Sequence, residues 1–427
     1  MIQIVKAGGG AEQAVISAMR ARAAQANQAI DAAVAEILKN VKENGFSAVR
    51  EYSLRFDKAE PRELEQAELE AAYNRCPAEL IAAMERAAAN IRDYNEKLLI
   101  KTAEWNSPDG GRVGRIVRGL TRVGIYVPGG TAAYPSSVLM NAVPAKVAGV
   151  EEIVMVTPPT ENLNDAVLAA ARIAGVDRVI AVGGAQAVAA LTYGAGFIPR
   201  VDKLVGPGNA YVAAAKRMAY GSLDIDMVAG PSEVLVITDD SADPKLVAAD
   251  LLSQAEHDKL ASAVLLTDSQ ALAQAVDGEL CRQTGYLSRS EIMECSLRDF
   301  GCAIVCDNLE ACADLANEIA PEHLEIMTRA PRALLPRIKN AGAVFLGAWS
   351  PEPLGDYLAG PDHVLPTSGT ARFFSPLSVD SFLKTMSVIE YDQASLTPIK
   401  DQIIALAEAE HLTAHANSIR VRFESAQ

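Results

Sequence analysis

The sequence predicts an α/β protein with largely parallel sheets, an N-terminal arm and a mostly helical C-terminal tail. Three patterns support this prediction. Apolar residues recur with helical spacing over the first 100 residues. From residue 122 onward, short apolar runs alternate with helical stretches, which is typical of parallel strands joined by helices. After residue 376 the strand pattern fades.

The N-terminal part begins with an apolar run at Ile2–Val5, which is followed by three glycines at 8–10. This pattern is similar to a phosphate-binding strand, loop and helix, but it lacks the glycine spacing of a dinucleotide loop. We therefore interpret residues 1–23 as an arm. Helical periodicity then predicts helices at 28–41, 64–73 and 78–98.

The strand signals are concentrated between residues 122 and 346. Short apolar runs predict strands at 123–127, 153–156, 178–182, 234–238, 263–267, 302–305 and 343–346. Helical stretches at 136–147, 165–174, 210–219 and 245–256 lie between most of them. A break near Gly230 and Pro231 marks a candidate domain junction.

Length and charge restrict the class of protein. The chain has 427 residues, which suggests two or three domains. Its 54 acidic and 39 basic residues give a net charge of −15, which argues against a nucleic-acid partner because phosphate binding needs a basic face. No apolar run approaches the ~20 residues that span a bilayer, so we expect no membrane association. The first residues lack the features of a secretion signal, and we expect a cytoplasmic protein.

Cysteine and histidine are both sparse. The six cysteines include no CxxC pair, which in a long cytosolic chain predicts reduced, mostly buried thiols. The five histidines all follow residue 256, so any imidazole chemistry is confined to the later part of the chain. They are His257, His323, His363, His411 and His415.

Glycine-rich turns at 127–131, 182–186 and 205–209 each precede a helical stretch. Glycine lets the backbone approach a ligand closely, and the N-terminus of the next helix favours an anion. None of the turns is a complete GxGxxG motif. Two interpretations stay open, namely ordinary turns and a nucleotide or dinucleotide crevice.

Gln254 and His257 lie near the end of a predicted helix. Their i, i+3 spacing places both on one face, where they could hold one ion, although a helix end facing solvent is the ordinary explanation of an isolated pair. Zinc accepts imidazole, carboxylate and carbonyl oxygen, and Asp356 and His415 are candidates for its further ligands.

Glu322 and His323 are adjacent, just after an acidic helical stretch. Imidazole titrates near pH 6.5 and a carboxylate can activate water, so this pair suits successive proton transfers. A solvated helix terminus is the alternative interpretation. His363 follows Asp362 and fits a turn residue oriented by its neighbour.

Together these segments resemble the histidinol dehydrogenase family, from about residue 35 to the C-terminus. Many blocks match in order along the chain, which makes the resemblance specific. The blocks are Val123–Gly130, Tyr134–Asn141, Gly206–Asn209, Ala229–Glu233, Asp250–His257, Ala320–Leu324, Gly355–Tyr357, His363–Thr367 and Leu412–Asn417.

The resemblance implies two incomplete Rossmann-like domains with mostly parallel sheets. The first would comprise residues 24–125 and 233–376 and would carry the metal and acid–base residues. The second, on the NAD side, would be inserted at 126–232. Residues 377–427 would form a tail that completes the site of the partner subunit in a homodimer with shared active sites.

The resemblance also implies an activity, the four-electron oxidation of L-histidinol to L-histidine through L-histidinal in the last steps of histidine biosynthesis. It implies two NAD per turnover and one Zn²⁺ per subunit. The implied zinc ligands are Gln254, His257, Asp356 and His415, and the acid–base pair is Glu322 and His323. The implied substrate contacts are Ser232, Gln254, His257, His323, Asp356, His363, Glu410 and His415. NAD would contact Tyr126, Gln186 and Asn209.

One position departs from the family pattern, because His411 stands where the family commonly has glycine. Two other functions stay open. The chain could oxidise another small alcohol, or it could be a non-catalytic metal- or nucleotide-binding homologue. A cysteine nucleophile is a rival route for the second oxidation, since five cysteines lie between Cys281 and Cys312.

Overall fold

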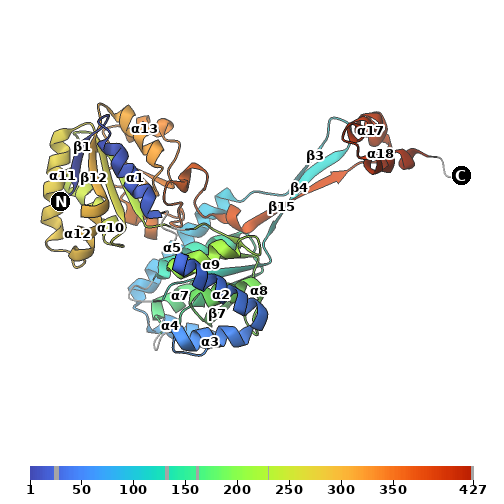
Figure 1. Ribbon diagram of the computed structural model, residues 1–427, viewed down its shortest axis with the longest axis horizontal. Helices are drawn as coiled ribbons and strands as arrows, with labels where there is room; N and C mark the ends of the chain where they lie inside the picture. The colour runs from blue at the N-terminus through green and yellow to red at the C-terminus, as the bar shows by residue number, and fades with distance from the viewer. Residues whose placement is uncertain (24–27, 130–133, 160–162, 229, 425–427) are drawn as a thin grey trace. The chain divides into compact units, whose positions relative to one another are not determined.

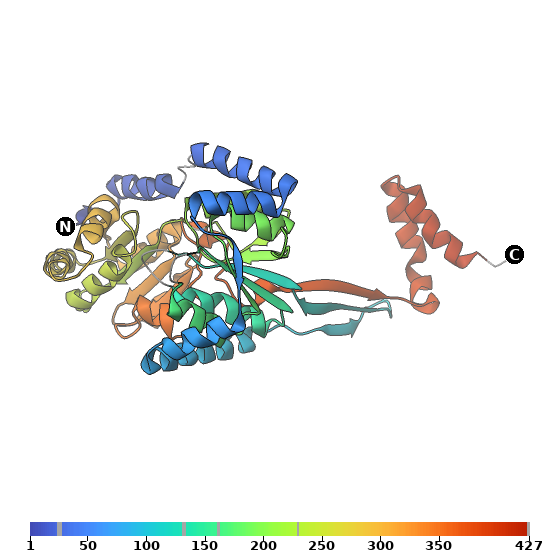
Figure 2. The same cartoon turned by 90° about the horizontal axis from the view of Figure 1, so that it is seen from below.

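The structure is a computed structural model that describes residues 1–23, 28–129, 134–159, 163–228 and 230–424. The chain forms two compact units (Figure 1; Figure 2). Unit 1 comprises residues 1–98 and 120–382, and unit 2 comprises residues 99–119 and 383–427. Gly130, Thr131 and Ala229, which belong to sequence blocks singled out above, lie outside the described residues.

The first sheet of unit 1 is parallel throughout and has the strand order β1-β12-β11-β10-β13-β14. Its strands are β1 (Gln3–Lys6), β10 (Glu233–Thr238), β11 (Ser262–Thr267), β12 (Gly301–Val305), β13 (His323–Met327) and β14 (Ala343–Leu346). Because β1 pairs with β12, the predicted N-terminal arm begins as an edge strand of this sheet.

Strand β10 illustrates why this sheet is buried on both faces. Val234 and Val236 belong to one apolar core, and Leu235 and Ile237 belong to another. Successive side chains of a strand point to opposite faces, so one apolar run serves both cores. The first core contains α10 (Pro244–Ala255), α11 (Gln270–Thr284) and α12 (Ser290–Phe300), and the second contains α1 (Ala11–Ala23), α13 (Leu309–Ile319) and α14 (Pro331–Leu334).

The second sheet of unit 1 has the order β2-β7-β6-β5-β8-β9, and only β2 runs antiparallel to its neighbour. Its strands are β2 (Arg62–Leu64), β5 (Arg122–Tyr126), β6 (Glu152–Thr157), β7 (Arg178–Ala181), β8 (Lys203–Val205) and β9 (Asp224–Ile225). After the edge strand β2, the chain enters the centre of the sheet at β5, adds β6 and β7 on one side, and then adds β8 and β9 on the other. The topological switch point therefore lies between β5 and β8.

Helices accompany the second sheet in two groups. A shared apolar core joins this sheet to α2 (Gln28–Asn44), α3 (Phe46–Phe56), α8 (Gly184–Tyr193) and α9 (Ala210–Ala219). Four further helices pack against one another, and these are α4 (Gln66–Arg75), α5 (Ala78–Leu98), α6 (Pro135–Val147) and α7 (Asp165–Ala174). Unit 1 also contains the short helix α15 (Glu352–Tyr357).

Unit 2 is built on an antiparallel sheet with the order β15-β4-β3. Its strands are β3 (Ala103–Asn106), β4 (Arg112–Gly119) and β15 (Leu383–Glu390). Three helices follow β15 along the chain (Figure 2), namely α16 (Gln393–Leu396), α17 (Lys400–Ala409) and α18 (Thr413–Arg420).

The predicted fold class is confirmed, since unit 1 is α/β with mostly parallel sheets and a helical tail is present. The prediction missed strands β2, β3, β4, β8, β9, β13 and β15. Strand β15 is largely exposed along its length, so it lacks the apolar run that marked the other strands. The predicted domain boundaries stay a prediction, but β2 pairs with β7, and this joins residues before 125 to the second sheet instead of the first.

Two further expectations concern cysteines and membranes. All six cysteines are free, and Cys302, Cys306 and Cys312 are buried while Cys281 is exposed. No helix in the described part of the chain combines the length and the apolar character needed to cross a bilayer.

Candidate active site

A cavity of about 400 Å³ in unit 1 is lined by residues at the ends of strands of both six-stranded sheets. Pro128 and Gly206 follow β5 and β8, the strands on either side of the switch point. Ser232 and His323 lie at the amino ends of β10 and β13. Because α/β sheets bind ligands at such switch points, this edge of the second sheet is a candidate ligand-binding edge. The first sheet contributes polar side chains to the same cavity.

The fold brings most of the predicted site residues together around this cavity. They come from segments that are far apart in the sequence, and their roles stay predictions. The predicted residues that line the cavity are Ser232, Gln254, His257, Glu322, His323, Asp356 and His363.

One side of the cavity offers a set of metal-binding atoms, which we call the metal corner and define as Gln254, His257, Glu352 and Asp356. The ligand atoms of His257, Glu352 and Asp356 all lie within 4.8 Å of one another. Gln254 lines the same cavity, and its Oε1 is buried without a hydrogen-bond partner among the described residues. Imidazole, carboxylate and amide oxygen are donors that zinc accepts, so this corner fits a zinc ion.

Glu352 is the member of the metal corner that the sequence analysis missed. It lies four residues before Asp356 on α15, and this i, i+4 spacing places both carboxylates on one face. The N–H of Glu352 donates to Oε1 of Glu325 at 2.8 Å. Burial, together with the nearby charge of Asp356, raises the pKa of Glu352 to about 9. In the sequence, the i, i+4 spacing between Glu352 and Asp356 is the signal from which Glu352 could have been predicted.

His323 presents one free ring nitrogen to the cavity. Its Nδ1 lies 2.9 Å from the backbone carbonyl oxygen of Glu233, which can only accept, so Nδ1 carries the proton. The Nε2 atom is buried and has no hydrogen-bond partner in the described part of the structure. Burial lowers the pKa of His323 to about 4, so the ring is neutral at pH 7. A neutral imidazole with a free lone pair can act as a general base.

Glu322 is buried beside His323. The alternative interpretation of this pair as a solvated helix terminus is therefore wrong. Ala320 ends α13 in a left-handed conformation with φ 55°, and the chain then turns into β13. The Oε2 atom of Glu322 accepts the N–H of Glu233 at 2.9 Å. Burial raises the pKa of Glu322 well above its ordinary value. Its carboxylate is therefore a stronger base than that of an exposed glutamate.

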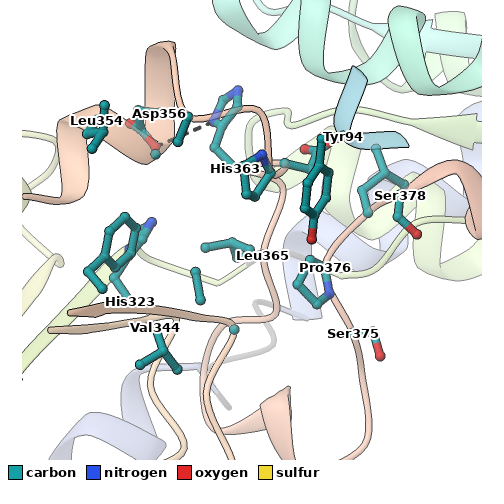
Figure 3. Close-up of a pocket in the computed structure, with 18 of the residues that line it drawn as sticks. Tyr94, His323, Val344, Leu354, Asp356, His363, Leu365, Ser375, Pro376 and Ser378 are labelled. Atoms are coloured by element: carbon teal, nitrogen blue, oxygen red, sulfur yellow. Dashed lines mark ion pairs between the residues drawn. The ribbon is translucent and has the colours of Figure 1, made fainter. Parts of the chain in front are cut away.

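A second cavity, of about 580 Å³, shares His323, Asp356 and His363 with the first. Figure 3 shows these three side chains lining it, with a dashed line between the neighbouring side chains of Asp356 and His363. The Nδ1 of His363 lies 3.9 Å from Oδ1 of Asp356. Burial lowers the pKa of His363, so its ring is mostly neutral at pH 7. His363 thus lies beside the metal corner, and its role as a substrate contact stays a prediction.

The three predicted NAD contacts lie at the carboxyl edge of the second sheet. Tyr126 ends β5, and its hydroxyl accepts the N–H of Gly184 at 3.0 Å. Burial raises the pKa of Tyr126 to about 12. Asn209 is exposed and caps α9, since its Oδ1 accepts the N–H of Tyr211 at 3.0 Å. Gln186, on the first turn of α8, is buried.

Comparison with known proteins identifies this architecture. A model of the histidinol dehydrogenase family matches residues 20–423. The chain is 51% identical to the histidinol dehydrogenase of Clostridium acetobutylicum, over 99% of each chain. It is 54% identical to that of Heliobacterium mobile, over 92% of this chain and 93% of the other. The chain belongs to the histidinol dehydrogenase family.

The structural comparison agrees with this assignment. The crystal structure of histidinol dehydrogenase from Elizabethkingia anophelis matches with a TM-score of 0.94 and 36% sequence identity, covering 99% of this chain and 98% of the other. As a member of the histidinol dehydrogenase family, the protein is an oxidoreductase.

Two residues that the histidinol dehydrogenase resemblance assigns to the site belong to unit 2. Glu410 follows α17, and His415 lies in α18. Both side chains are exposed within the chain. His411 lies between them with φ 60°, a left-handed conformation that favours glycine. A glycine at this position would adopt the same backbone conformation without strain.

Proposed function

We propose that the protein oxidises L-histidinol to L-histidine through L-histidinal, with two NAD per turnover and one Zn²⁺ per subunit, in the last steps of histidine biosynthesis. One observation carries the proposal most directly. The free Nε2 of the neutral His323 lines the same cavity as the metal corner and the switch point of the second sheet. A base, a set of metal-binding atoms and the ligand-binding edge of the second sheet therefore line one cavity, which supports the proposal.

The proposed zinc ligands are Gln254, His257, Asp356 and His415, with Glu352 placed beside them. Bound there, zinc would hold the imidazole and amine of the substrate and so orient its hydroxyl group. The unpartnered Oε1 of Gln254 and the proximity of His257 and Asp356 support this assignment. Imidazole must be unprotonated to bind zinc, so zinc affinity should weaken below about pH 6.5. Affinity that stays flat down to about pH 5 would contradict imidazole ligation.

The first oxidation needs a base, because an alcohol is a poor hydride donor until its hydroxyl proton leaves. Nε2 of His323 would take that proton while the Glu233 carbonyl holds the ring by Nδ1. NAD supplies the acceptor for the hydride from carbon. The products are the aldehyde, NADH and one proton, which the imidazole passes to solvent.

The second oxidation needs the aldehyde in its hydrated form. Glu322 would accept a proton from water as the water oxygen adds to the aldehyde carbon, and it would return that proton to the former carbonyl oxygen, giving the gem-diol. His323 would then remove a hydroxyl proton again, and a second hydride would leave carbon for a fresh dinucleotide. The carboxylic acid formed loses its proton to solvent.

The rival cysteine route has no support from the cavity linings, since no cysteine is among the residues lining either cavity described above. Replacing the five cysteines between Cys281 and Cys312 by serine tests it. A folded variant that still forms acid supports hydration by Glu322. A folded variant that releases aldehyde would restore the cysteine route.

We further propose a homodimer in which unit 2 of each chain completes the site of its partner through Glu410 and His415. Coexpression of His323→Ala chains with His415→Ala chains tests this. In mixed dimers, one site of two would receive an intact His323 and an intact His415. Random assortment would then restore about a quarter of the sites. Activity no greater than that of the two separate variants would show that His415 acts within its own chain.

Substrate choice separates the remaining alternatives. Purified, zinc-loaded protein with NAD should form NADH with L-histidinol but not with a small primary alcohol that lacks an imidazole. Turnover of the other alcohol alone would favour a related dehydrogenase. Zinc retention without any turnover would favour a non-catalytic homologue. The cytoplasmic location stays a prediction.

A further inference from the structure

Asp57, which the sequence analysis did not single out, lies beside the predicted dinucleotide edge. It directly follows α3 and is half-buried. Its Oδ2 accepts the side-chain N–H of Gln186 at 3.1 Å, and its carboxylate also accepts the backbone N–H of Gly183. Gly183 follows β7 and caps α8. Asp57 therefore lies at the carboxyl end of β7, against the glycine-rich turn at 182–186.

Two of the predicted NAD contacts, Tyr126 and Gln186, expose almost no side-chain surface at this turn. Tyr126 is 2% exposed and Gln186 is 1% exposed. Their polar groups are engaged by the same turn, because Gly184 donates to the Tyr126 hydroxyl and Gln186 donates to Asp57. Asp57 is the most accessible polar group of this trio. A ligand crossing the turn would meet its carboxylate before either of the other two side chains.

The charge of this carboxylate is not neutralised by a basic side chain. Among the ion pairs of the described residues, none joins Asp57 to a lysine or arginine. The carboxylate also lies at the N-terminus of α8, where a bound phosphate would otherwise be favoured. An anion placed next to it would meet like-charge repulsion. A hydroxyl group would instead find a charged acceptor with free lone pairs.

The position suits the sugar end of an extended dinucleotide. Pro128, two residues after the end of β5, lines the cavity that contains His323. In the second sheet, β6 separates β5 from β7. Two strand spacings correspond to about 10 Å, which an extended dinucleotide spans easily. In many dinucleotide folds an acidic side chain binds the ribose hydroxyls, and a ribose phosphate requires a basic residue instead.

We propose that Asp57 accepts a hydrogen bond from a ribose hydroxyl of the dinucleotide and selects against a dinucleotide that carries a ribose phosphate. This inference rests on the proposed function, because it assumes that NAD binds at the carboxyl edge of the second sheet. Asp57 is thus a specificity residue for the cofactor, and it takes no part in the proton transfers.

Binding of the reduced cofactors provides a test that does not require turnover. NADH and NADPH are titrated separately into the wild type, Asp57→Asn and the matched control Asp109→Asn, with fluorescence as the readout. Asp109 is exposed in unit 2. We expect Asp57→Asn to weaken NADH binding about tenfold, since a hydrogen bond to a charged group is lost. The preference for NADH over NADPH should fall at least tenfold, and the control should match the wild type.

The kcat/KM values with NAD and NADP provide a second readout and should show the same loss of preference. If Asp57→Asn does not fold, Asp57→Ser removes the same charge. A variant that binds both cofactors like the wild type, or weakens both equally, would overturn the inference. Wild type that prefers NADH in the titration but does not oxidise L-histidinol would overturn the proposed function and leave the cofactor inference standing. Wild type that binds neither cofactor would overturn both.

Discussion

The Nδ1 atom of His323 lies 2.9 Å from the backbone carbonyl oxygen of Glu233, and this contact determines which ring nitrogen is free. Glu233 also donates its N–H to Oε2 of Glu322 at 2.9 Å. One backbone residue at the start of β10 therefore holds both members of the acid–base pair. The pair is positioned by the first sheet itself, independently of any metal.

His323→Ala should abolish the overall reaction and leave zinc bound. Loss of a general base typically lowers a rate by about 10²–10⁴-fold, and both oxidation steps depend on this one. Steady-state kinetics and zinc content of the purified variant check the two parts. Loss of zinc from the variant would place His323 among the metal ligands and contradict its role as the base.

Glu352 should make the metal-free protein less stable as the pH rises. Its pKa is about 9 in the folded chain, whereas an unfolded glutamate titrates near 4.5, so the folded state keeps a proton that the unfolded state loses. Between pH 7 and pH 9 this group lowers the free energy of unfolding by up to ~1.4 kcal/mol per pH unit. The low pKa of His323 affects stability only below about pH 6.5, outside this range.

Urea unfolding in a metal chelator at pH 7, 8 and 9 measures this slope. Glu352→Gln should make the slope less steep, because the amide does not titrate and only the other buried carboxyl groups, such as Glu322, still contribute. Glu310→Gln, an exposed change on α13, should leave the wild-type slope intact. Equal slopes for the wild type and Glu352→Gln would show that Glu352 is ionised in the metal-free protein.

Lys216 and Asp226 form a buried ion pair next to the cavity, with side chains 4% and 2% exposed. Lys216 Nζ also donates to the carbonyl of Gly206 at 2.8 Å, and the N–H of Gly206 donates to Asp226 at 2.8 Å. Lys216→Met leaves a buried carboxylate unpaired and should cost about 3–5 kcal/mol of folding free energy.

Adding Asp226→Asn to Lys216→Met should recover part of that loss, because the unpaired charge disappears. Urea unfolding of both single variants and the double variant gives the coupling energy. Strict additivity of the two changes would show that the pair does not interact in solution.

His411→Gly should stabilise the protein by about 0.5–1 kcal/mol. His411 has φ 60° where α17 ends, and the N–H of Leu412 donates to the carbonyl of Ala407 at 2.8 Å. This is the helix ending that favours glycine, since glycine lacks the side chain that strains a left-handed backbone. Thermal unfolding checks the sign, and His411→Ala, which keeps a Cβ, should give no such gain.

Much of unit 1 could be predicted from the sequence because its strands are short, buried apolar runs. The order of β10 and β11, with helix α10 between them, follows directly from that pattern. Strand β15 could not be found in this way, because its stability comes from pairing with β4 and not from burial of its own side chains.

The site divides in a similar manner. Gln254 and His257 lie close enough in sequence to suggest chemistry, and so do Glu322 and His323. The burial and orientation of Glu322 and His323, however, depend on β13, a strand that the sequence did not indicate. Glu322 and His323 follow a helix in the sequence, but β13 pairs with β10 and β14 and buries them. Asp57 meets Gln186 only through packing of α3 against α8, a contact between distant segments that no local pattern encodes.

The ratio of NADH formed to L-histidine formed tests the central claim most directly. Zinc-loaded protein is supplied with L-histidinol and excess NAD, and both products are counted over the same interval. If His323 serves both oxidations in one cavity, with Glu322 hydrating the aldehyde between them, the ratio is two and no free aldehyde accumulates. Formation of one NADH per L-histidinal released into solution, without L-histidine, would contradict the four-electron reaction.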